Sequence, residues 1–528
     1  MHGNLMHGKR SRATTMNVKP IDTARLTGRY ERVTTMRTLP SRMSLRRRSL
    51  WLQQALPEER GMEVPRLTDT TDVDICIVGG GYTGLWTALR ITELAPSASV
   101  VIVEADICGG GASGRNGGMA LSWWPKIETL IERVGREEAV RLAHASAQAI
   151  TDLGAFCARE GIDAHFRQAG WLWTATSPAQ MNSWSGAIRA CAALGVHPFQ
   201  ELEPAEVQRR TGSPANLGAV LEASGATVQP ALLARGLRRV ALQRGVRIFE
   251  QSPMLEIDRD LGIVRTALGS VRAETIVLAT NAWAAQIHEL RRAIVPLSSD
   301  MVATEPMPDR LAESGWTGGE SISNSRLMVH YYRTTQDGRI AFGRGGGALG
   351  LAGRFGPGFD YSPERANQVT HDLRRLVPNA ASVGTTHLWG GAVDRSEDGL
   401  PLFGRLPGRR PVLYGVGLSG NGVGPCAIAG RILASTALSR DDEWENSGLN
   451  TGVPGQFPPE PFRFVGGIVV REAVRRKEER EDWGRDVDPI THRLAALAPS
   501  GYFKVTPASE REPVAPPPTA PVAPPAAR

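Results

Sequence analysis

A glycine-rich turn after an apolar run constrains this 528-residue chain more than any other feature of its sequence. The run is VDICIV, Val73–Val78, and it is followed by GGGYTG, which has the spacing GxGxxG at Gly79, Gly81 and Gly84. In a strand–turn–helix unit of this kind, the first glycine makes the tight turn and the second lets the backbone approach a pyrophosphate. The third lets the helix pack closely on the strand. We therefore predict a Rossmann-type dinucleotide-binding unit.

The residues that follow supply the rest of the expected unit. A helix-compatible run covers Leu85–Leu94, and a second strand-like run, Ser99–Val103, ends on Glu104. About twenty residues after the last glycine, such domains carry an acidic side chain that accepts a hydrogen bond from a ribose hydroxyl. Glu104 is the candidate for this role, and an α/β turn that binds no ligand is the alternative.

A second glycine-rich loop, GGGASGRNGG at Gly109–Gly118, follows Glu104 closely. The carboxyl end of the second strand borders the ligand crevice in a doubly wound sheet, and glycine backbone allows close approach there. We expect this loop to contact the cofactor, with a mobile surface loop as the alternative. The candidate contacts are Ser113, Arg115, Asn116, Gly117 and Gly118.

A third loop lies three hundred residues further on. PVLYGV, Pro411–Val416, is followed by GLSGNGVG, Gly417–Gly424, and then by a helical run that starts with Pro425. A helix N-terminus favours negative charge, which a reduced flavin develops near N1 and C2=O and a nicotinamide does not. This loop therefore favours a flavin, and an ordinary β-to-α turn is the alternative. The candidate contacts are Gly417, Gly420, Asn421, Gly422 and Val423.

The net charge of +7 is concentrated at the N-terminus. Residues 1–50 hold twelve Lys or Arg against two acidic residues, a balance of +10, which leaves −3 for the rest of the chain. The mildly acidic body argues against a nucleic-acid binder, and no apolar run reaches the length of a membrane span. We expect a cytoplasmic protein without a nucleic-acid or membrane partner.

The spacing of cysteines and histidines argues against two further classes of protein, disulfide reductases and metal-binding proteins. The five cysteines include no CxxC pair, and the ten histidines include no HxH or HxxxH group. The first absence argues against a disulfide reductase, and together they predict that the chain holds no metal.

Both ends of the chain differ in composition from its centre. Residues 1–70 are predicted to be a basic, largely disordered arm, with translation starting at Met43 and a transit peptide as the alternative. Residues 441–503 are predicted to be a helical extension, in which Gly467–Trp483 forms a charged surface helix. The Pro- and Ala-rich residues 504–528 are predicted to be disordered.

Together with the three loops, several segments resemble the D-amino-acid oxidase-like (DAO) superfamily of FAD-dependent oxidoreductases, which includes glycine and sarcosine oxidases. The nearest resemblance is to γ-glutamylputrescine oxidase-like members. The segments are VEADICGGGASGRNGGM, ATNAW (279–283), HYYRTTQDGRIAFG (330–343) and WGGAVDRSEDGLPLFGRLP (389–407).

The resemblance implies an α/β fold with an α+β substrate domain. The Rossmann-type FAD-binding domain would be discontinuous, over residues 71–159, 229–295 and 386–440, and a mixed-sheet substrate domain would cover 160–228 and 296–385. It also implies cofactor contacts at Met254, Thr280 and Gly390.

The resemblance further implies oxidation of a C–N bond of a small amine or amino acid. A hydride passes from the α-carbon to flavin N5, and the resulting imine is hydrolysed. The chain lacks the Cys or His that tethers flavin in some relatives, which implies non-covalent FAD. No Lys lies between Lys126 and Lys477, so the Lys that promotes reaction with oxygen in some relatives is absent. Oxygen, giving H2O2, is still the expected acceptor, with another acceptor as the alternative.

Substrate contacts are expected in His330-Tyr331-Tyr332-Arg333. Strand alternation places His330 and Tyr332 on one face and Tyr331 and Arg333 on the other, and one face should meet the flavin. An Arg there could bind a carboxylate, and a Tyr or Trp such as Trp389 could enclose the amine. The alternative is that these side chains serve packing. Two other functions stay open, which are a dehydrogenase of a 2-hydroxy acid or polyol phosphate and a non-catalytic flavoprotein subunit.

Overall fold

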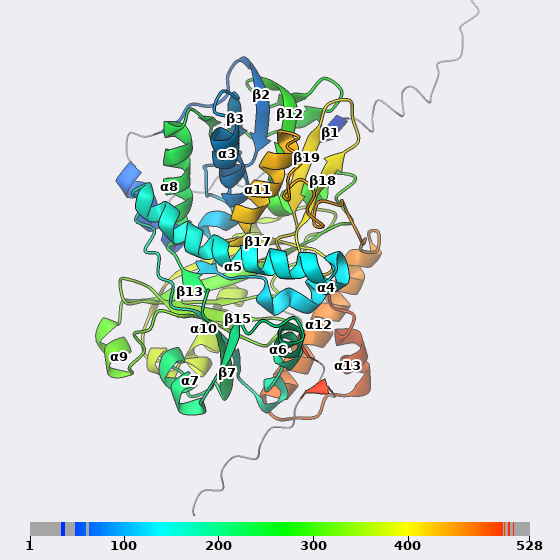
Figure 1. Cartoon of the computed structure of the whole chain (residues 1–528). Helices are drawn as coiled ribbons and strands as arrows, with labels where there is room; N and C mark the ends of the chain where they lie inside the picture. The colour runs from blue at the N-terminus through cyan, green and yellow to red at the C-terminus, as the bar shows by residue number, and fades with distance from the viewer. Residues whose placement is uncertain are drawn as a thin grey trace, which may run out of the picture.

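The protein is described by a computed structural model that covers residues 33–36, 48–59, 63–499, 501, 505–506 and 510–511. Two large sheets form its two halves, drawn as the upper and lower parts of Figure 1, and the long helix α5 (Arg136–Arg159) runs between them. The predicted α/β class with a mixed-sheet second half is confirmed.

The first sheet has a parallel centre in which β12, β2, β3 and β9 lie side by side, with β19 parallel to β12 on its other side. An antiparallel edge of β1, β10 and β11 joins β12, and β18 pairs with β19. Apolar runs such as Val100–Val103 are buried on both faces, as parallel strands require. The strands are β1 (Val33–Thr35), β2 (Thr70–Val78), β3 (Val100–Val103), β9 (Arg247–Phe249), β10 (Glu256–Asp258), β11 (Ile263–Arg265), β12 (Ser270–Leu278), β18 (Leu402–Leu406) and β19 (Val412–Val416).

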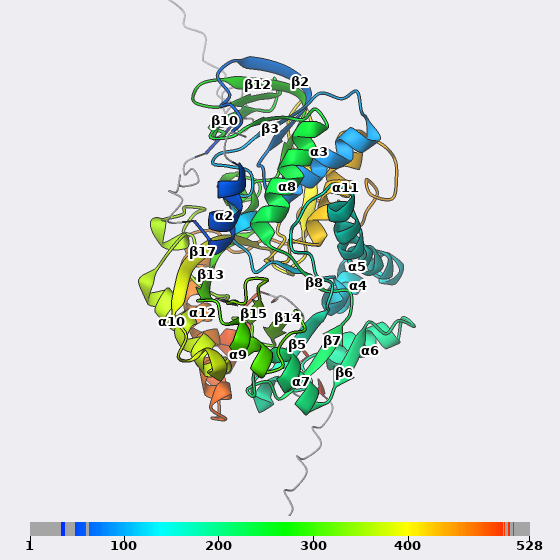
Figure 2. The same ribbon diagram turned by 90° about the vertical axis from the view of Figure 1, so that its left-hand side faces the viewer.

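Helices cover this sheet. The helix α3 (Tyr82–Leu94) packs against α8 (Pro230–Gln243) and α11 (Pro425–Ala437). Figure 2 shows α2 (Leu50–Ala55) beside α8. The helix α4 (Ile127–Val134) precedes α5, and the short strands β4 (Met119–Ala120) and β8 (Ala226–Thr227) pair between the halves.

The second sheet has the order β17-β13-β16-β15-β14-β5-β7-β6. Its neighbours are antiparallel except for β14 and β5, which are parallel, and α10 packs against β13 and β16. Its strands are β5 (Trp171–Ala175), β6 (Phe199–Leu202), β7 (Gly218–Glu222), β13 (Val295–Thr304), β14 (Ser321–Asn324), β15 (His330–Thr334), β16 (Ile340–Arg344) and β17 (Thr385–Arg395). Its helices are α6 (Ser185–Ala192), α7 (Pro204–Thr211), α9 (Pro308–Glu313) and α10 (Pro363–Leu376).

The structure differs from the sequence-based segmentation at two places. Residues 385–395 form β17 of the second sheet, so the third segment of the predicted FAD domain enters the first sheet only at β18. Residues 50–55, within the arm predicted to be largely disordered, form α2, because Leu50, Trp51 and Leu52 lie in a buried apolar site against α8 and the second glycine loop.

Beyond the two sheets, the predicted extension contains α12 (Phe462–Asp482) and α13 (Pro489–Ala495), which pack on each other. The expectations for Met43 and for most of residues 504–528 lie outside the described residues. Among the helices that the structure describes, none combines the length and the apolar character needed to cross a membrane.

Candidate cofactor and substrate site

A cavity lies where the carboxyl ends of β2, β3 and β12 face the second sheet. All three glycine-rich loops contribute to its wall, and so do residues of β13, β15 and β17. Twelve of the predicted cofactor residues line it, which are Gly79, Gly81, Glu104, Ser113, Arg115, Asn116, Gly117, Met254, Thr280, Gly420, Gly422 and Val423. Each of the other five is adjacent in sequence to a residue that lines the cavity. These five are Gly84, Gly118, Gly390, Gly417 and Asn421.

The first loop needs its glycines for close backbone contacts. Gly79 has a φ of +114°, and a Cβ there would lie 2.4 Å from the carbonyl oxygen of Ala279. A Cβ at Gly84 would lie 2.0 Å from the carbonyl oxygen of Gly79. The helix α3 begins directly after Gly81, which provides no side-chain cap. The turn therefore brings β2, β12 and the start of α3 together at the cavity.

Glu104, at the end of β3, uses both carboxylate oxygens. Oε2 accepts a hydrogen bond from the Gly80 backbone N–H at 2.7 Å, and Oε1 accepts one from Asp106 N–H at 2.8 Å. Burial raises the pKa of this carboxyl to about 7. Glu104 thus joins the first two glycine loops while facing the cavity, where its lone pairs can also accept from a hydroxyl.

The second loop is shaped by its own polar side chains. Ser113 Oγ accepts from Tyr82 N–H at 2.8 Å, and Asn116 Oδ1 accepts from Gly118 N–H at 2.7 Å. Arg115 donates to the Gly110 carbonyl at 2.9 Å and forms an ion pair with Asp360 at 2.5 Å. These side chains therefore fix the loop as well as lining the cavity.

A segment that the sequence analysis assigned to the disordered arm supports this loop from behind. Arg48 forms a bidentate pair with Asp106 at 2.7 and 2.9 Å, Ser49 Oγ donates to Gly114 O, and Trp51 Nε1 donates to Asn116 O at 2.9 Å. A signal was present, because Ser49 precedes the apolar run LWLQQAL as an N-cap precedes a helix.

The third loop is held by a buried carboxylate that the sequence analysis missed. Asp394 Oδ2 accepts from Gly417 N–H at 2.6 Å, and Oδ1 accepts from Ser419 N–H at 3.3 Å. Burial raises the pKa of Asp394 to about 6. The loop leads into α11, whose N-cap, Gly424, provides no side-chain cap.

The donor set fits FAD. Thr280 Oγ1 and Trp283 Nε1, on residues that line the cavity, are buried without a hydrogen-bond partner among the described residues, as is Asn421 Oδ1. Buried polar atoms are normally paired, so these atoms are available to a polar ligand. Gly111 leaves open space where a Cβ would stand. The helix α11 begins at the cavity without a side-chain cap, and α3 begins there with its first N–H, that of Tyr82, bound to Ser113 Oγ. The remaining N–H groups of helix N-termini suit a diphosphate and an electron-rich ring.

The candidate substrate residues separate on the two faces of β15. Tyr331 lines the cavity, and its hydroxyl is 2.9 Å from Ser299 Oγ. Tyr332 lies on the opposite face, where it accepts a hydrogen bond from Asn216 at 2.8 Å and packs in the apolar core of Ile322 and Phe342. The strand therefore presents one of its two tyrosines to the cavity.

Arg333 and Trp389 lie behind the second glycine loop and do not line the cavity. Arg333 donates to the carbonyls of Gly117 and Val228 at 2.8 and 2.5 Å. Trp389 donates to Arg115 O at 2.8 Å and packs edge-on against Trp51, over which the Arg333 guanidinium also lies. In this position, both side chains contact the loop that carries the cavity residues.

His330 is fully buried on the face of β15 away from the cavity. Its Nδ1 lies 3.1 Å from Asn324 Nδ2, and its Nε2 lies 3.2 Å from Asp372 Oδ2. Because Asn324 Oδ1 accepts from the His330 backbone N–H, its amide nitrogen faces the ring, so Nδ1 accepts and Nε2–H donates to Asp372. Burial lowers the pKa of His330 to about 3, which keeps this neutral tautomer.

This arrangement predicts a pH-dependent stability. Below its ordinary pKa of 6.5, His330 takes up a proton in the unfolded chain but not in the folded one, so folding stability falls as pH falls. Between pH 7 and pH 5 the loss from this residue is roughly 2 kcal/mol. We expect urea unfolding to show that His330→Gln loses that much less stability than the wild type over this interval. Parallel losses in both proteins would contradict the assignment.

Further aromatic and charged residues line the cavity. Trp283 stacks on Phe355 with ring centroids 4.8 Å apart, and Phe355 meets Phe359 edge-on at 5.2 Å. Asp360, paired with Arg115, follows Phe359. No sequence signal marks Phe355, Phe359 or Asp360, because they lie in a segment without a recognisable hydrophobic period.

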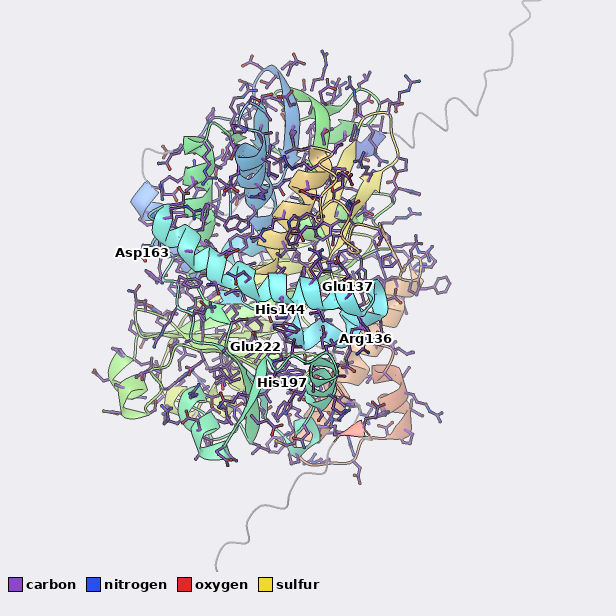
Figure 3. All side chains as sticks on the ribbon, viewed as in Figure 1. Arg136, Glu137, His144, Asp163, His197 and Glu222 are labelled. Atoms are coloured by element: carbon purple, nitrogen blue, oxygen red, sulfur yellow. The ribbon has the colours of Figure 1, made fainter. Side chains whose placement is uncertain are left out.

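Among the described residues, no three His, Cys, Asp or Glu side chains come together as metal ligands would. Figure 3 draws the described side chains and labels His144 of α5, Glu222 of β7 and His197, which lies between α6 and β6.

Comparisons with known proteins agree with this geometry. The family described as FAD dependent oxidoreductase (DAO) matches residues 74–436. A probable oxidoreductase OrdL of Haemophilus influenzae is 27% identical over 391 residues, covering 72% of this chain and 86% of its own. A gamma-glutamylputrescine oxidoreductase of Escherichia coli is 29% identical over 372 residues, covering 70% and 84%. The crystal structure of glycine oxidase from Geobacillus kaustophilus superimposes with a TM-score of 0.59 at 21% identity, covering 72% of this chain and 98% of its own.

Proposed function

The chain belongs to the DAO family of FAD-dependent oxidoreductases, and we propose that it oxidises the C–N bond of a small amine or amino acid. The observation that carries the proposal is one cavity in which three FAD-type glycine loops meet the face of β15 that bears Tyr331. Relatives named for gamma-glutamylputrescine and glycine support an amine over a hydroxy acid.

The residues that would hold FAD follow from the three loops. The start of α3 and the second loop would bind the diphosphate, and Glu104 a ribose hydroxyl. The third loop and the start of α11 would face the isoalloxazine ring, where they favour negative charge. When bound, FAD supplies the acceptor for a hydride from the carbon next to the amine nitrogen.

We infer that FAD is held without a covalent bond. Among the described residues, no His lines the cavity, and the one Cys that does is Cys426. Burial raises the pKa of Cys426 to about 12, and its Sγ lies 3.2 Å from Thr83 Oγ1. This cysteine is therefore a thiol rather than a thiolate, and a thiol is a poor nucleophile.

The substrate would bind between Tyr331 and the aromatic residues Trp283, Phe355 and Phe359. The rings exclude water and contact the carbon chain. Burial raises the pKa of Tyr331 well above its ordinary value, so its phenol stays protonated and serves as a hydrogen-bonding group rather than a base. These residues orient the neutral amine, and orientation in a dry site is the main contribution that the protein itself must make.

Anaerobic reduction of the flavin tests the proposed activity. Primary amines, N-methyl amino acids and aminophosphonates are each mixed with the purified protein, next to 2-hydroxy acids and polyol phosphates. We expect the flavin absorbance to bleach with at least one amine and with none of the hydroxylated compounds. Readmitting air should restore it with one H2O2 per flavin. Bleaching by a hydroxy acid alone would indicate the alternative dehydrogenase, and no bleaching at all a non-catalytic flavoprotein.

A further inference from the structure

The helix α12 lies beyond residue 436, where the family match ends, and packs against the segment that connects β14 to β15. It is drawn in orange in Figure 1. Its residues Ala473 and Val474 form an apolar cluster with Met328 of the segment between β14 and β15, and Ala495 of α13 completes the cluster. The contact therefore joins the C-terminal extension to a segment that leads directly into the cavity strand β15.

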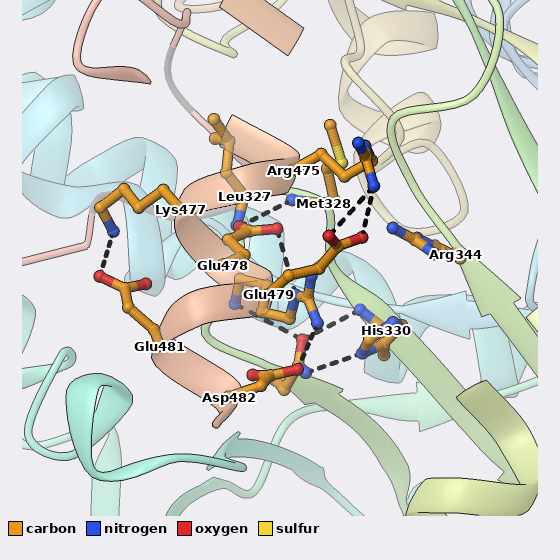
Figure 4. Close-up of polar contacts among 12 residues, drawn as sticks. Leu327, Met328, His330, Arg344, Arg475, Lys477, Glu478, Glu479, Glu481 and Asp482 are labelled. Carbon is orange, nitrogen blue, oxygen red and sulfur yellow. Dashed lines mark hydrogen bonds and ion pairs between the residues drawn. The ribbon is translucent and has the colours of Figure 1, made fainter. Parts of the chain in front are cut away.

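Glu478 of α12 binds this segment through hydrogen bonds. Its side chain is 6% exposed, and Oε1 accepts hydrogen bonds from the backbone N–H groups of Leu327 and Met328 at 2.5 and 3.2 Å. Oε2 accepts from Arg326 Nε at 3.1 Å. Figure 4 shows Glu478 pointing from the helix toward Leu327 and Met328. One buried carboxylate thus satisfies three consecutive residues of the loop.

A second carboxylate of α12, that of Asp482, pairs with two arginines. Asp482 Oδ2 lies 2.7 Å from Arg326 Nη1 and 3.0 Å from Arg375 of α10. The Arg326 side chain is 3% exposed, and a guanidinium at that depth needs its partners to be stable. The loop is therefore anchored by buried ion pairs rather than by exposed ones, which contribute little.

The anchored loop and its neighbour form part of the cavity wall. Val329, which follows Met328, lines the cavity, and so do Gly345 and Gly346. The two segments are joined, because Gly345 N–H donates to Val329 O at 3.0 Å and Met328 packs directly on Gly346.

The same helix holds the neighbouring segment as well. Arg471 Nη1 of α12 donates to the carbonyl oxygen of Gly347 at 2.5 Å. Glu478 and Arg471 therefore hold two wall segments, residues 326–329 and 345–347, from the same helix. Neither segment belongs to the three glycine loops.

We propose that α12 is a positioning element of the substrate end of the cavity. Through Glu478 and Arg471 it sets the distance between the wall segments 326–329 and 345–347, and so determines which substrates fit against Tyr331. The effect on substrate affinity rests on the proposed function. The support of the two wall segments by α12 does not depend on it. Loss of this support should change substrate affinity and leave FAD binding intact.

Variants of Glu478 test the proposal. In Glu478→Ala, hydrogen–deuterium exchange at residues 326–330 and 345–347 should become about tenfold faster, since two amides lose their acceptor. Exchange at the glycine loops and the FAD content should stay unchanged. For the amine that reduces the wild-type flavin best, KM should rise about tenfold while kcat changes less than about threefold. Glu478→Gln, which keeps an acceptor oxygen, should restore most of both properties.

Two further variants make the test decisive. Arg471→Met removes one hydrogen bond and should speed exchange at residues 345–347 alone, which keeps the test available if Glu478→Ala does not fold. Glu479→Ala, on the same helix but paired with the exposed Arg475, is the matched control and should behave as wild type. Unchanged exchange at 326–330 in Glu478→Ala, or a fall in FAD content equal to the change in KM, would overturn the proposal.

The proposal and the proposed function can fail separately. If no amine reduces the wild-type flavin, the proposed function fails, and exchange together with iodide quenching of the flavin fluorescence still decides the role of α12. Quenching should increase in Glu478→Ala if the wall loosens. Equal quenching in Glu478→Ala and wild type would contradict the proposed role of α12.

Discussion

Gly79→Ala is expected to yield protein without bound FAD. Gly79 has a φ of +114°, which an L-residue adopts only with strain, and its Cβ would lie 2.4 Å from Ala279 O. Relieving that overlap moves the ends of β2 and β12 apart, where the diphosphate would bind. We expect FAD affinity to fall at least about a hundredfold, equivalent to ~3 kcal/mol. FAD is measured in the supernatant after acid precipitation, where all of the wild-type flavin should appear if it is held non-covalently.

The matched control is Gly466→Ala in α12, where a Cβ meets nothing within 4 Å. Alanine favours the helix, so this variant should keep its FAD and its melting temperature. A Gly79→Ala protein that retains one FAD at wild-type affinity would show that this turn does not form the cofactor site. Flavin that stays with the precipitated wild-type protein would contradict non-covalent binding.

The second large effect is expected at Tyr331. Its ring lines the cavity and its hydroxyl lies 2.9 Å from Ser299 Oγ. Tyr331→Ala opens the substrate end and removes an orienting contact, so the rate constant of flavin reduction at low amine concentration should fall about a hundredfold. Tyr331→Phe, which loses the hydroxyl alone, should fall about tenfold. Stopped-flow anaerobic reduction measures both, on protein whose FAD content is first shown to equal that of the wild type.

Tyr332 provides the control, since it is the next residue but faces the other way. Tyr332→Phe loses the hydrogen bond from Asn216, so its free energy of unfolding should fall by about 1 kcal/mol while flavin reduction is unchanged. If Tyr332→Phe slowed reduction as much as Tyr331→Ala, the assignment of the two faces of β15 would be wrong.

That the glycine-rich loops line one cavity could be predicted from the sequence because their signals are local. The spacing of Gly79, Gly81 and Gly84 after an apolar run specifies a strand, a turn and a helix N-terminus within twelve residues. The family that these loops suggested is confirmed. Each loop adjoins its own strand, so the parallel order of β12, β2 and β3 is enough to bring two of them to the same edge.

The part of the cavity that β15 forms could not be predicted in the same way, because both faces of β15 carry buried or partly buried side chains. Alternation separates Tyr331 from His330 and Tyr332, but it does not say which face meets the cavity. That choice depends on Asp372 of α10, which pairs with His330 on the far face. Contacts of this kind join residues about forty positions apart in the chain and leave no periodic signal.

Two segments outside the family match also support the cavity, residues 48–51 and α12. Their roles could not be predicted either, because their partners are distant in the sequence. Arg48 and Trp51 lie in a basic stretch whose charge suggests a solvated arm, yet Asp106 and Asn116 O provide buried partners for them. Glu478 lies in a helix whose charges alternate as on an exposed surface, and only the fold reveals that Arg326 needs it. A buried ion pair is defined by both partners, and a sequence shows each of them alone.

A single turnover tests the central claim most directly. The purified protein, with one FAD per chain, is mixed without oxygen with the amine that bleaches it, and the products are quantified after the flavin is fully reduced. We expect one carbonyl product and one released amine or ammonia for each FAD reduced. A flavin that stays oxidised with every amine, or that is reduced by a 2-hydroxy acid with formation of a 2-oxo acid, would contradict the claim.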